Sequence, residues 1–438
     1  MAKFHSISVF YFSFFITISA VSVWLWGQEN VIGTRQLYPL ITPIFIVFMG
    51  VAMAGLFLRV LSIFRHVSFS PKTLTNYESW PPVSIVRPIN GTDPYLGERL
   101  ETMFNLNYPG KFEIIFCLDD KNDQAIPVIQ QLRQKYSQVD SRISIEPNIK
   151  VLNPCMRNIE QGIRYSKYPN GLVWVCASRI ICQTDQMKDM VARCCNNKGL
   201  VMQHYYVKAK STSFASHVER IYFASSFSSL VPALEMLSAP TACGASFIFP
   251  HSFLDKLGGC ETIGKYLAED FIIGNICEDL GLNIDFSYFP VLQDNSRCLT
   301  MKLFNERQIR WAKIRICVLP VLFTLLEKLS LPVMNSGLFA LPASYLFGIP
   351  VAICYFPFLL LLFIQDLIIV HMVDYKYNRL ENFPNPFTYF CYWTLVQLLQ
   401  LVLLIVAFKN SSRIRWGDKV YSVADKTLIK HVDYFIKQ

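Results

Sequence analysis

Acidic side chains stand at two places in the sequence where they could handle protons or a charged ligand. Asp119 and Asp120 follow an apolar run, at a point where a strand would end, and α/β sheets bind ligands beyond such strand ends. These two residues would equally suit a turn or a helix cap. Glu269 and Asp270 come directly before an apolar run, where burial would raise the pKa of a carboxylate and suit it to act as a general base. The alternative for this pair is the first turn of a helix, where the helix dipole favours acids.

Basic and aromatic side chains gather near residue 310. Arg307, Arg310 and Trp311 are followed by two more basic residues, Lys313 and Arg315. Guanidinium groups bind diphosphates through paired hydrogen bonds, and tryptophan can line a sugar or nucleobase site. The alternative is a basic amphipathic helix on a membrane surface, with its tryptophan in the headgroup layer. One helix could serve both purposes.

The elements that would position these residues alternate between strands and helices. Short apolar runs and helical patterns follow one another through residues 70–315, which predicts βαβ units and a mainly parallel sheet buried on both faces. The expected strands are 83–86, 112–117, 143–145 and 172–176, and the expected helices are 98–105, 123–136 and 154–165. No glycine-rich phosphate loop follows any of these strands, which disfavours P-loop ATPases and dinucleotide-binding enzymes.

Composition indicates a membrane protein. Of the 438 residues, 52% are apolar and only 17% charged, which excludes disordered and collagen-like chains. The net charge of +9 favours anionic lipid headgroups or phosphorylated ligands over nucleic acid as partners. The 13 cysteines include no CxxC pair, so we expect buried thiols in a reducing compartment rather than a structural zinc site.

Uncharged stretches near both ends predict how the chain meets the membrane. Residues 1–28 have the composition of a signal peptide or signal anchor, and 36–60 that of a transmembrane span. Arg65 and Lys72 follow this span, so the positive-inside rule places the region 70–315 in the cytosol. Towards the C-terminus we expect an interfacial or re-entrant segment plus a span at 351–373 within 316–373, a further span at 387–408, and a basic cytosolic tail at 409–438.

Several of these motifs occur in the order known from one enzyme family. Between about residue 36 and residue 425 the chain resembles the ceramide glucosyltransferases, membrane members of the inverting glycosyltransferase family that includes cellulose and chitin synthases. The motifs that carry the resemblance are Val83–Pro88, Leu100–Thr102, Asn107–Pro109, Cys117–Asp120, Tyr266–Asp270, Arg307–Trp311, Arg415–Trp416 and Tyr421–Val423.

The resemblance implies a GT-A-like α/β nucleotide-sugar transferase domain, with a mainly parallel sheet, carried on transmembrane helices. It implies that glucose passes from UDP-glucose to the primary hydroxyl of ceramide with inversion, in a Golgi or endoplasmic reticulum membrane, with the catalytic domain facing the cytosol. Asp270 stands where the family has its general base, and Arg307, Arg310 and Trp311 stand where it holds diphosphate and acceptor.

The donor half of the site is expected around Asp120 and Arg87, and here the chain departs from the family. The family has an aspartate directly after the strand that corresponds to 172–176, whereas this chain has Ala177 there, followed two residues later by Arg179. Alanine cannot bind the divalent cation, Mg²⁺ or Mn²⁺, that the resemblance implies. In one hypothesis Arg179 supplies the missing positive charge in a working enzyme. In the other, the chain is a weakly active or inactive paralogue that keeps the fold.

Overall fold

The computed structural model describes most of the chain from Tyr38 onwards, and the segment 1–28 lies outside the described residues. The described ranges are 38–74, 80–146, 149–197, 199–207, 211, 213–238, 244–295, 299–376, 385–417 and 419–434.

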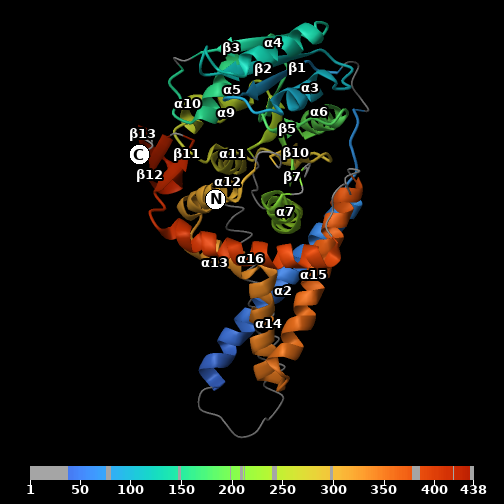
Figure 1. Ribbon diagram of the computed structural model, residues 1–438, viewed down its shortest axis with the longest axis vertical. Coiled ribbons are helices and arrows are strands. Elements are labelled where there is room, and N and C mark those ends of the chain that lie inside the picture. Colours follow the sequence, from blue (N-terminus) through green and yellow to red (C-terminus); the bar gives the residue numbers. More distant parts are fainter. Residues whose placement is uncertain are drawn as a thin grey trace. The chain divides into compact units, whose positions relative to one another are not determined.

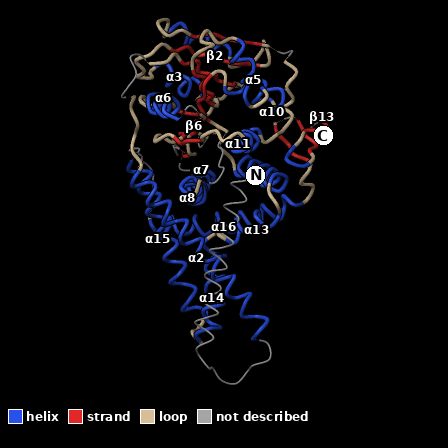
Figure 2. Tube along the Cα trace, turned by 180° about the vertical axis from the view of Figure 1, so that it is seen from behind, coloured by secondary structure: helices blue, strands red, loops and turns tan. Residues whose placement is uncertain are grey.

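The chain divides into two compact units, each assembled from segments far apart in the sequence. The sheet unit comprises Phe69–Arg220, Thr241–Val318 and Asn410–Gln438, and the helical unit comprises Met1–Ser68, Ile221–Pro240 and Leu319–Lys409. Every strand in the described part of the chain belongs to the sheet unit (Figure 2).

Seven strands form the main sheet, in the order β3-β2-β1-β4-β8-β6-β9. They are β1 (Val83–Pro88), β2 (Phe112–Leu118), β3 (Ser141–Ile145), β4 (Leu172–Cys176), β6 (Leu200–Met202), β8 (Ser246–Pro250) and β9 (Ile284–Phe286). The first four neighbours run parallel, whereas β8 runs antiparallel to both β4 and β6. The mainly parallel sheet that the sequence predicts is therefore confirmed.

Helices cover both faces of this sheet because its strands are apolar on both faces. Along β1, Val83 and Ile85 pack into a cluster with residues of α3 (Leu96–Phe104), α4 (Ile126–Lys135) and α6 (Gln186–Asn197). The alternate residue Val86 points to the opposite face, where it meets Gly162 of α5 (Pro154–Arg164). The remaining helices of the sheet unit are α7 (Phe214–Ile221), α9 (Phe253–Lys256), α10 (Gly259–Ile263), α11 (Glu269–Asp279) and α12 (Met301–Val318) (Figure 1).

Local patterns located these elements to within a few residues. The helix expected from residue 123 begins instead at Ile126, because the Asp123 carboxylate accepts hydrogen bonds from the backbone N–H groups of Ala125 and Gly91 and so forms the preceding turn. The strand at 172–176 lies where it was expected.

Two small sheets complete the unit. One joins β5 (Ile180–Ile181), β10 (Val291–Gln293) and β7 (Tyr205–Val207). The other joins β11 (Arg413–Trp416), β12 (Lys419–Val423) and β13 (Ile429–Tyr434) within the segment whose charge pattern predicted only a basic tail. This sheet folds because Ile414, Tyr421 and Val423 bury their side chains together, with Ile314 of α12 packed against them.

The helical unit contains the apolar helices. It consists of α2 (Tyr38–Ser68), the π-helical segment Tyr222–Phe227, α8 (Ser228–Met236), α13 (Val321–Leu329), α14 (Pro332–Phe347), α15 (Val351–Lys376) and α16 (Pro386–Phe408). By length and composition, the segments Ile41–Ser68, Val351–Val373 and Pro386–Phe408 are able to cross a membrane. The first overlaps the predicted span 36–60 from residue 41 onwards, and the other two cover the predicted spans 351–373 and 387–408. Their placement in a bilayer, and that of the predicted interfacial or re-entrant segment, stays a prediction.

Replacing Gly162 by alanine tests the contact between α5 and β1. A Cβ atom at this position would lie 2.5 Å from Cγ2 of Val86, so one of the two elements must shift. We expect the variant to lose about 1–3 kcal/mol of unfolding free energy, seen as a lower Tm in detergent. Gly97→Ala in α3 is the matched control, because its Cβ would meet Val128 at an ordinary 3.4 Å. An unchanged Tm for Gly162→Ala would contradict the close packing.

Candidate functional site

The loops that follow β1, β2 and β4 meet at one edge of the main sheet, because these strands are parallel. The start of β8 reaches the same edge, where the backbone N–H of Ala177 donates to the carbonyl of Ala245 at 2.9 Å. The end of β6 also reaches it, since Gln203 N–H donates to the Ser246 carbonyl at 3.2 Å. This strand-end edge carries all the predicted donor-binding residues.

The buried side chain of Arg87 binds the loop that follows β4. One of its terminal nitrogens lies 2.8 Å from Sγ of Cys176. The other donates to the carbonyls of Ile180 at 2.8 Å and Ser178 at 3.2 Å. A guanidinium held in this way shapes the loop that carries Arg179. Direct contact of Arg87 with a donor stays a prediction.

Asp93 and Arg99 form an ion pair next to the same loop. Arg99 Nε also donates to the carbonyl of Ser178 at 3.3 Å. Burial alone would raise the pKa of Asp93, but the hydrogen bonds from Arg99 and from the Tyr95 N–H outweigh it and hold that pKa below its ordinary value. Asp93 is therefore ionised and already paired.

The two aspartates after β2 have different environments. Asp119 is bound by Arg157, whose Nε lies 3.0 Å from Oδ1 and whose Nη2 also contacts the carboxylate. Asp120 is exposed, and its carboxylate accepts a hydrogen bond from the backbone N–H of Asn122 at 2.9 Å. The second residue of the motif is the more accessible one, which agrees with the predicted donor-binding role of Asp120 without testing it.

The residues at this edge do not fit a divalent cation. Hard cations prefer several carboxylate oxygens, whereas Asp93 and Asp119 are each engaged by an arginine, and Ala177 offers no ligand atom. Within the described ranges, no group of three acidic, histidine or cysteine side chains has the geometry to hold a metal ion. The cation that the resemblance implies therefore finds no ligand set among these residues.

Arg179 lies two residues after Ala177, the position at which the expected carboxylate is missing. Its Nη1 donates to Oδ1 of Asn295 at 3.2 Å, and its carbonyl accepts from the backbone N–H of Asp294. The side chain is reached by solvent but surrounded by protein, so desolvation lowers the pKa of Arg179, and the charges of Arg307 and Arg99 lower it further. Two other guanidinium groups therefore lie near enough to repel it.

A buried carboxylate links Arg179 to α12. Glu219, at the end of α7, is fully buried and is ion-paired with Arg307. The same carboxylate oxygen accepts a hydrogen bond from Nδ2 of Asn295 at 3.1 Å, and Asn295 in turn holds Arg179. The short chain from Arg307 through Glu219 and Asn295 to Arg179 thus brings together residues that are more than 100 positions apart.

Aromatic rings flank the arginines of α12. The guanidinium of Arg307 lies 5.5 Å from the centre of the Trp311 ring, and that of Arg310 lies 5.1 Å from the ring of Trp416. Tyr205 packs beside Trp311, with 6.4 Å between ring centres. Burial lowers the pKa of Arg310 to about 10, and the nearby charges of Arg307 and Arg179 contribute. Several guanidinium groups with few carboxylates among them form a region that favours an anion.

The acidic pair, Glu269 and Asp270, lies in the first turn of α11. Nδ2 of Asn153 donates to Oε2 of Glu269 at 2.9 Å, while Asp270 accepts hydrogen bonds from the backbone N–H groups of Phe271 and Gly244. Burial and the neighbouring Asp270 raise the pKa of Glu269 to about 7, and burial raises the pKa of Asp270 as well. The helix start is confirmed, and the raised pKa values agree with a general base at Asp270, whose role stays a prediction.

Sequence reasoning missed three contributors to this site. Glu219 and Asn295 lie in no motif that the sequence displays, and their importance depends entirely on the distant residues they join. Asn153 stands just before an expected helix and caps it, donating at the same time to Glu269. The sequence can indicate that Asn153 caps a helix, but it does not indicate that Asn153 also binds Glu269.

Comparison with known proteins identifies relatives for almost the whole of this chain. The family model "Glycosyl transferase family 21" matches residues 43–429. Ceramide glucosyltransferase 3 of Caenorhabditis elegans is 30% identical over 79% of this chain and 73% of its own length. Ceramide glucosyltransferase of Candida albicans is 30% identical over 40% of this chain and 35% of its own. Among solved structures, the mannosyltransferase PcManGT from Pyrobaculum calidifontis, in complex with GDP-Man and Mn²⁺, aligns with a TM-score of 0.43 and 14% identity, covering 76% of this chain and 99% of that one.

Replacing Glu269 by glutamine tests the raised pKa of the acidic pair. The carboxyl has a folded-state pKa of about 7 against an ordinary value of 4.5, so its contribution to stability is present below pH 4.5 and is lost as the pH rises through 7. Glutamine does not ionise, so the variant does not lose this stability as the pH rises. We therefore expect the Tm difference, variant minus wild type, to increase by about 2 °C or more from pH 6 to pH 8.

The control for this titration is Glu261→Gln. Glu261 is an exposed acid of α10, and water solvates it in the folded and the unfolded chain alike. Its Tm difference from the wild type should stay constant over the same pH range. A constant difference for Glu269→Gln as well would show that the acidic pair is not desolvated.

Proposed function

This chain belongs to glycosyl transferase family 21, and from that premise we propose that it transfers glucose from UDP-glucose to the primary hydroxyl of ceramide with inversion of the sugar. The observation that carries the proposal is the acidic pair in the first turn of α11, half-buried at Asp270 and with raised pKa values in the same unit as an arginine-rich region. The mainly parallel α/β sheet and the apolar helices that the sequence predicts are confirmed.

Asp270 is the proposed general base. Its carboxylate takes the proton from the ceramide hydroxyl as that oxygen attacks the anomeric carbon of glucose, and the bond from this carbon to the UDP oxygen breaks on the opposite face. The backbone N–H of Gly244 approaches Asp270 closely, since a Cβ at Gly244 would lie 3.2 Å from Oδ2. This contact and that from Phe271 orient the carboxylate, while burial keeps its proton affinity high.

Glu269 supports the base without taking part in the transfer. With a pKa near 7 it shares the ionisation of the pair with Asp270, so that a proton gained by one carboxyl is stabilised by the negative charge of the other. Asn153 holds Glu269 in place from the start of α5.

Arginines receive the leaving group in this proposal. The diphosphate of UDP gains negative charge as the sugar departs, and Arg179, Arg307 and Arg310 offer several N–H donors with a charge of matching sign. Arg179 then does the work that a metal ion would otherwise do. Asp120 is the proposed contact to the nucleotide, and Arg87 is the residue that shapes the Arg179 loop.

Trp311 and the neighbouring ring of Tyr205 are the proposed wall for sugar or acceptor. Ceramide is insoluble in water, so the reaction requires a site at a bilayer, which the apolar helices can provide. We propose a Golgi or endoplasmic reticulum membrane with the sheet unit in the cytosol. Arg59 and Arg65 near the end of α2 support this orientation by the positive-inside rule.

The second candidate is a paralogue that binds without transferring. Ala177 is the observation that favours it, because losing a metal carboxylate removes stabilisation from the leaving group. The enzyme is expected to bind and turn over its donor, whereas the inactive paralogue is expected to transfer no sugar. The same fold could also accept a different nucleotide sugar as donor. Comparing UDP-glucose, UDP-galactose and UDP-N-acetylglucosamine as donors separates these possibilities.

Replacing Asp270 by asparagine tests the proposed base. Asparagine keeps the size and one acceptor oxygen but cannot take a proton, so we expect kcat to fall by about 10²–10⁴-fold with little change in the KM for UDP-glucose. The assay measures labelled glucose transferred to short-chain ceramide in membranes from cells that lack their own ceramide glucosyltransferase.

Asp279→Asn is the matched control for this variant. Asp279 is an exposed acid at the opposite end of the same helix, and its replacement should leave transfer unchanged. Wild-type activity in Asp270→Asn would remove the proposed base. Absence of transfer by the folded wild type, with every donor tried, would favour the inactive paralogue.

Calorimetry with UDP, the nucleotide part of the donor, tests whether Arg179 binds the diphosphate without a metal ion. EDTA is present throughout to remove divalent cations. We expect the wild type to bind UDP under these conditions and Arg179→Ala to bind about 10–100-fold more weakly, since hydrogen bonds to charged groups contribute about 1.5–3 kcal/mol. Arg179→Lys should be intermediate, because it keeps the charge but loses the fork.

The control is Arg164→Ala, which removes an exposed arginine of α5 that pairs with Glu160. This variant should bind UDP as the wild type does. Binding that requires Mg²⁺ or Mn²⁺, or unchanged affinity in Arg179→Ala, would overturn the role given to Arg179.

A further inference from the structure

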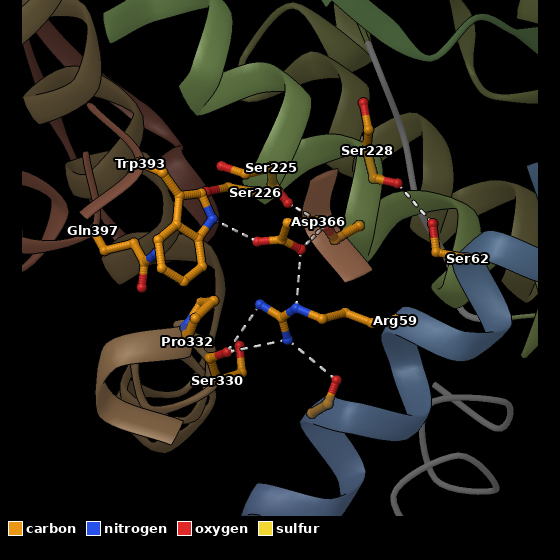
Figure 3. Close-up of polar contacts among 12 residues, drawn as sticks. Arg59, Ser62, Ser225, Ser226, Ser228, Ser330, Pro332, Asp366, Trp393 and Gln397 are labelled. Carbon is orange, nitrogen blue, oxygen red and sulfur yellow. Dashed lines mark hydrogen bonds and ion pairs between the residues drawn. The ribbon is translucent and has the colours of Figure 1, made fainter. Parts of the chain in front are cut away.

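A buried ion pair joins the apolar helices of the helical unit. Nε of Arg59 in α2 lies 3.0 Å from Oδ1 of Asp366 in α15, and both side chains are buried (Figure 3). Asp366 also accepts hydrogen bonds from Oγ of Ser229 at 2.9 Å and from the indole N–H of Trp393 in α16 at 2.9 Å. A carboxylate with these three donors is well satisfied, so this cluster fixes three helices and α8 at one point.

Three helices run side by side from this point. The stacked rings of Phe339 and Phe358, 4.3 Å apart, join α14 to α15. These two helices form an antiparallel hairpin, because α14 ends at Phe347 and α15 begins at Val351. Helix α2 packs against the hairpin, and Figure 1 shows the three helices extending together from the end that carries Arg59.

The direction of α2 relative to the hairpin follows from two contacts. Near the start of α2, Phe45 meets Tyr345 at the end of α14, with 4.9 Å between ring centres. Further along α2, Gly55 lies against Asn335 at the start of α14. Helix α14 is thus antiparallel to α2, and it begins beside the part of α2 that holds Gly55 and Arg59.

Among the described residues, the polar contacts of α16 with other helices lie near the start of α14. Trp393 binds Asp366, Gln397 Oε1 accepts from the backbone N–H of Val333 in the first turn of α14, and Gln400 Nε2 donates to Ser226. From Trp393 to Gln400 a helix rises about 10 Å, and within this distance α16 reaches three separate elements. A helix packed lengthwise along α15 would instead contact α15 over several successive turns. Figure 1 shows α16 running across α2 and α15 close to the start of α14, with α2 and α15 continuing beyond it.

Charged residues mark the end of the bundle at which α14 starts. Arg59 and Asp366 lie there, as does Lys328, whose Nζ binds Glu327 at 2.9 Å and approaches Gln400. Away from this end, residues 329–365 carry no charge at all. Charged side chains prefer the membrane surface and uncharged helices its interior, so the α16 end of the bundle lies at the surface and the hairpin tip lies inward.

The outer face of α16 is apolar along its whole length. Leu395, Leu398, Val402 and Ile405 are exposed and recur every three or four residues, which places them on one stripe. The opposite face carries the polar groups that bind the rest of the unit, Trp393, Gln397 and Gln400. A helix with this division suits the boundary between headgroups and acyl chains.

We infer that α14 and α15 enter and leave the bilayer on one face, and that α16 lies along that face with its apolar stripe against lipid. The segment 387–408 is then a membrane-surface helix, although its composition predicts a span. The inference is independent of the proposed reaction, since it rests on contacts within the helical unit. Both ends of the 319–409 segment lead into the sheet unit, which agrees with a return to the side of departure.

Nitroxide depth measurements in liposomes test the orientation of α16. Single labels at Leu395, Leu398, Val402 and Ile405, in full-length protein whose reactive cysteines are replaced by serine, should all report one shallow depth. A spanning helix would instead give a depth that changes steadily along the chain, and this result would overturn the inference. The matched control is α15, where exposed Ile353, Phe356, Leu360 and Ile364 should show such a steady change.

A glycosylation cassette inserted between Lys376 and Asn385 tests the same inference in cells. If the hairpin returns to the cytosolic face, the cassette stays unmodified, and a glycan there would count against the inference. The same cassette placed just before Tyr38 is the positive control, because α2 leads from the lumen to the cytosol in the proposed orientation. Failure of the glucosyl transfer assay would leave both measurements unaffected.

Discussion

A charge that leaves water must find a partner, and this constraint organises both units of the protein. In the helical unit, Asp366 is buried among apolar helices, and Arg59, Ser229 and Trp393 converge on it. In the sheet unit, the buried Glu219 carboxylate draws Arg307 and Asn295 together. Because an unpaired buried charge costs several kcal/mol, each of these carboxylates determines which distant segments can lie next to one another.

The same constraint explains the character of the candidate site. Desolvation, and then repulsion between neighbouring arginines, lowers the pKa of Arg310 to about 10 and lowers that of Arg179 too. Such a region is most stable when a multivalent anion is bound. On the acidic side, Glu269 and Asp270 compete for the same limited solvation, so their pKa values rise. The proposed base and the proposed anion site therefore depend on the same condition, which is the presence of charged groups in a partly desolvated region.

Much of the sheet unit could be predicted from local patterns. The strand at 172–176 and the helix from residue 154 follow from apolar runs and a capped, proline-led start. Asp270 and Arg307 were recognisable because they lie in short motifs. Glu219 was not recognisable, because nothing near it in the sequence indicates that it meets Arg307. Composition likewise predicted a transmembrane span at 387–408, but it does not encode which neighbouring helices this segment crosses.

The sequence by itself determined the alternation of strands and helices, the apolar segments and the family to which the chain belongs, since these depend on neighbouring residues and short motifs. Only the tertiary structure decided that the 413–434 segment forms a sheet against α12, that Arg179 is tied to Asn295, and that α16 crosses α15 close to the start of α14. The packing of this sheet on α12, the bond of Arg179 to Asn295 and the contact of α16 with α15 depend on residues more than 20 positions apart. Such pairings are selected by burial and charge balance in the folded chain, which no local pattern encodes.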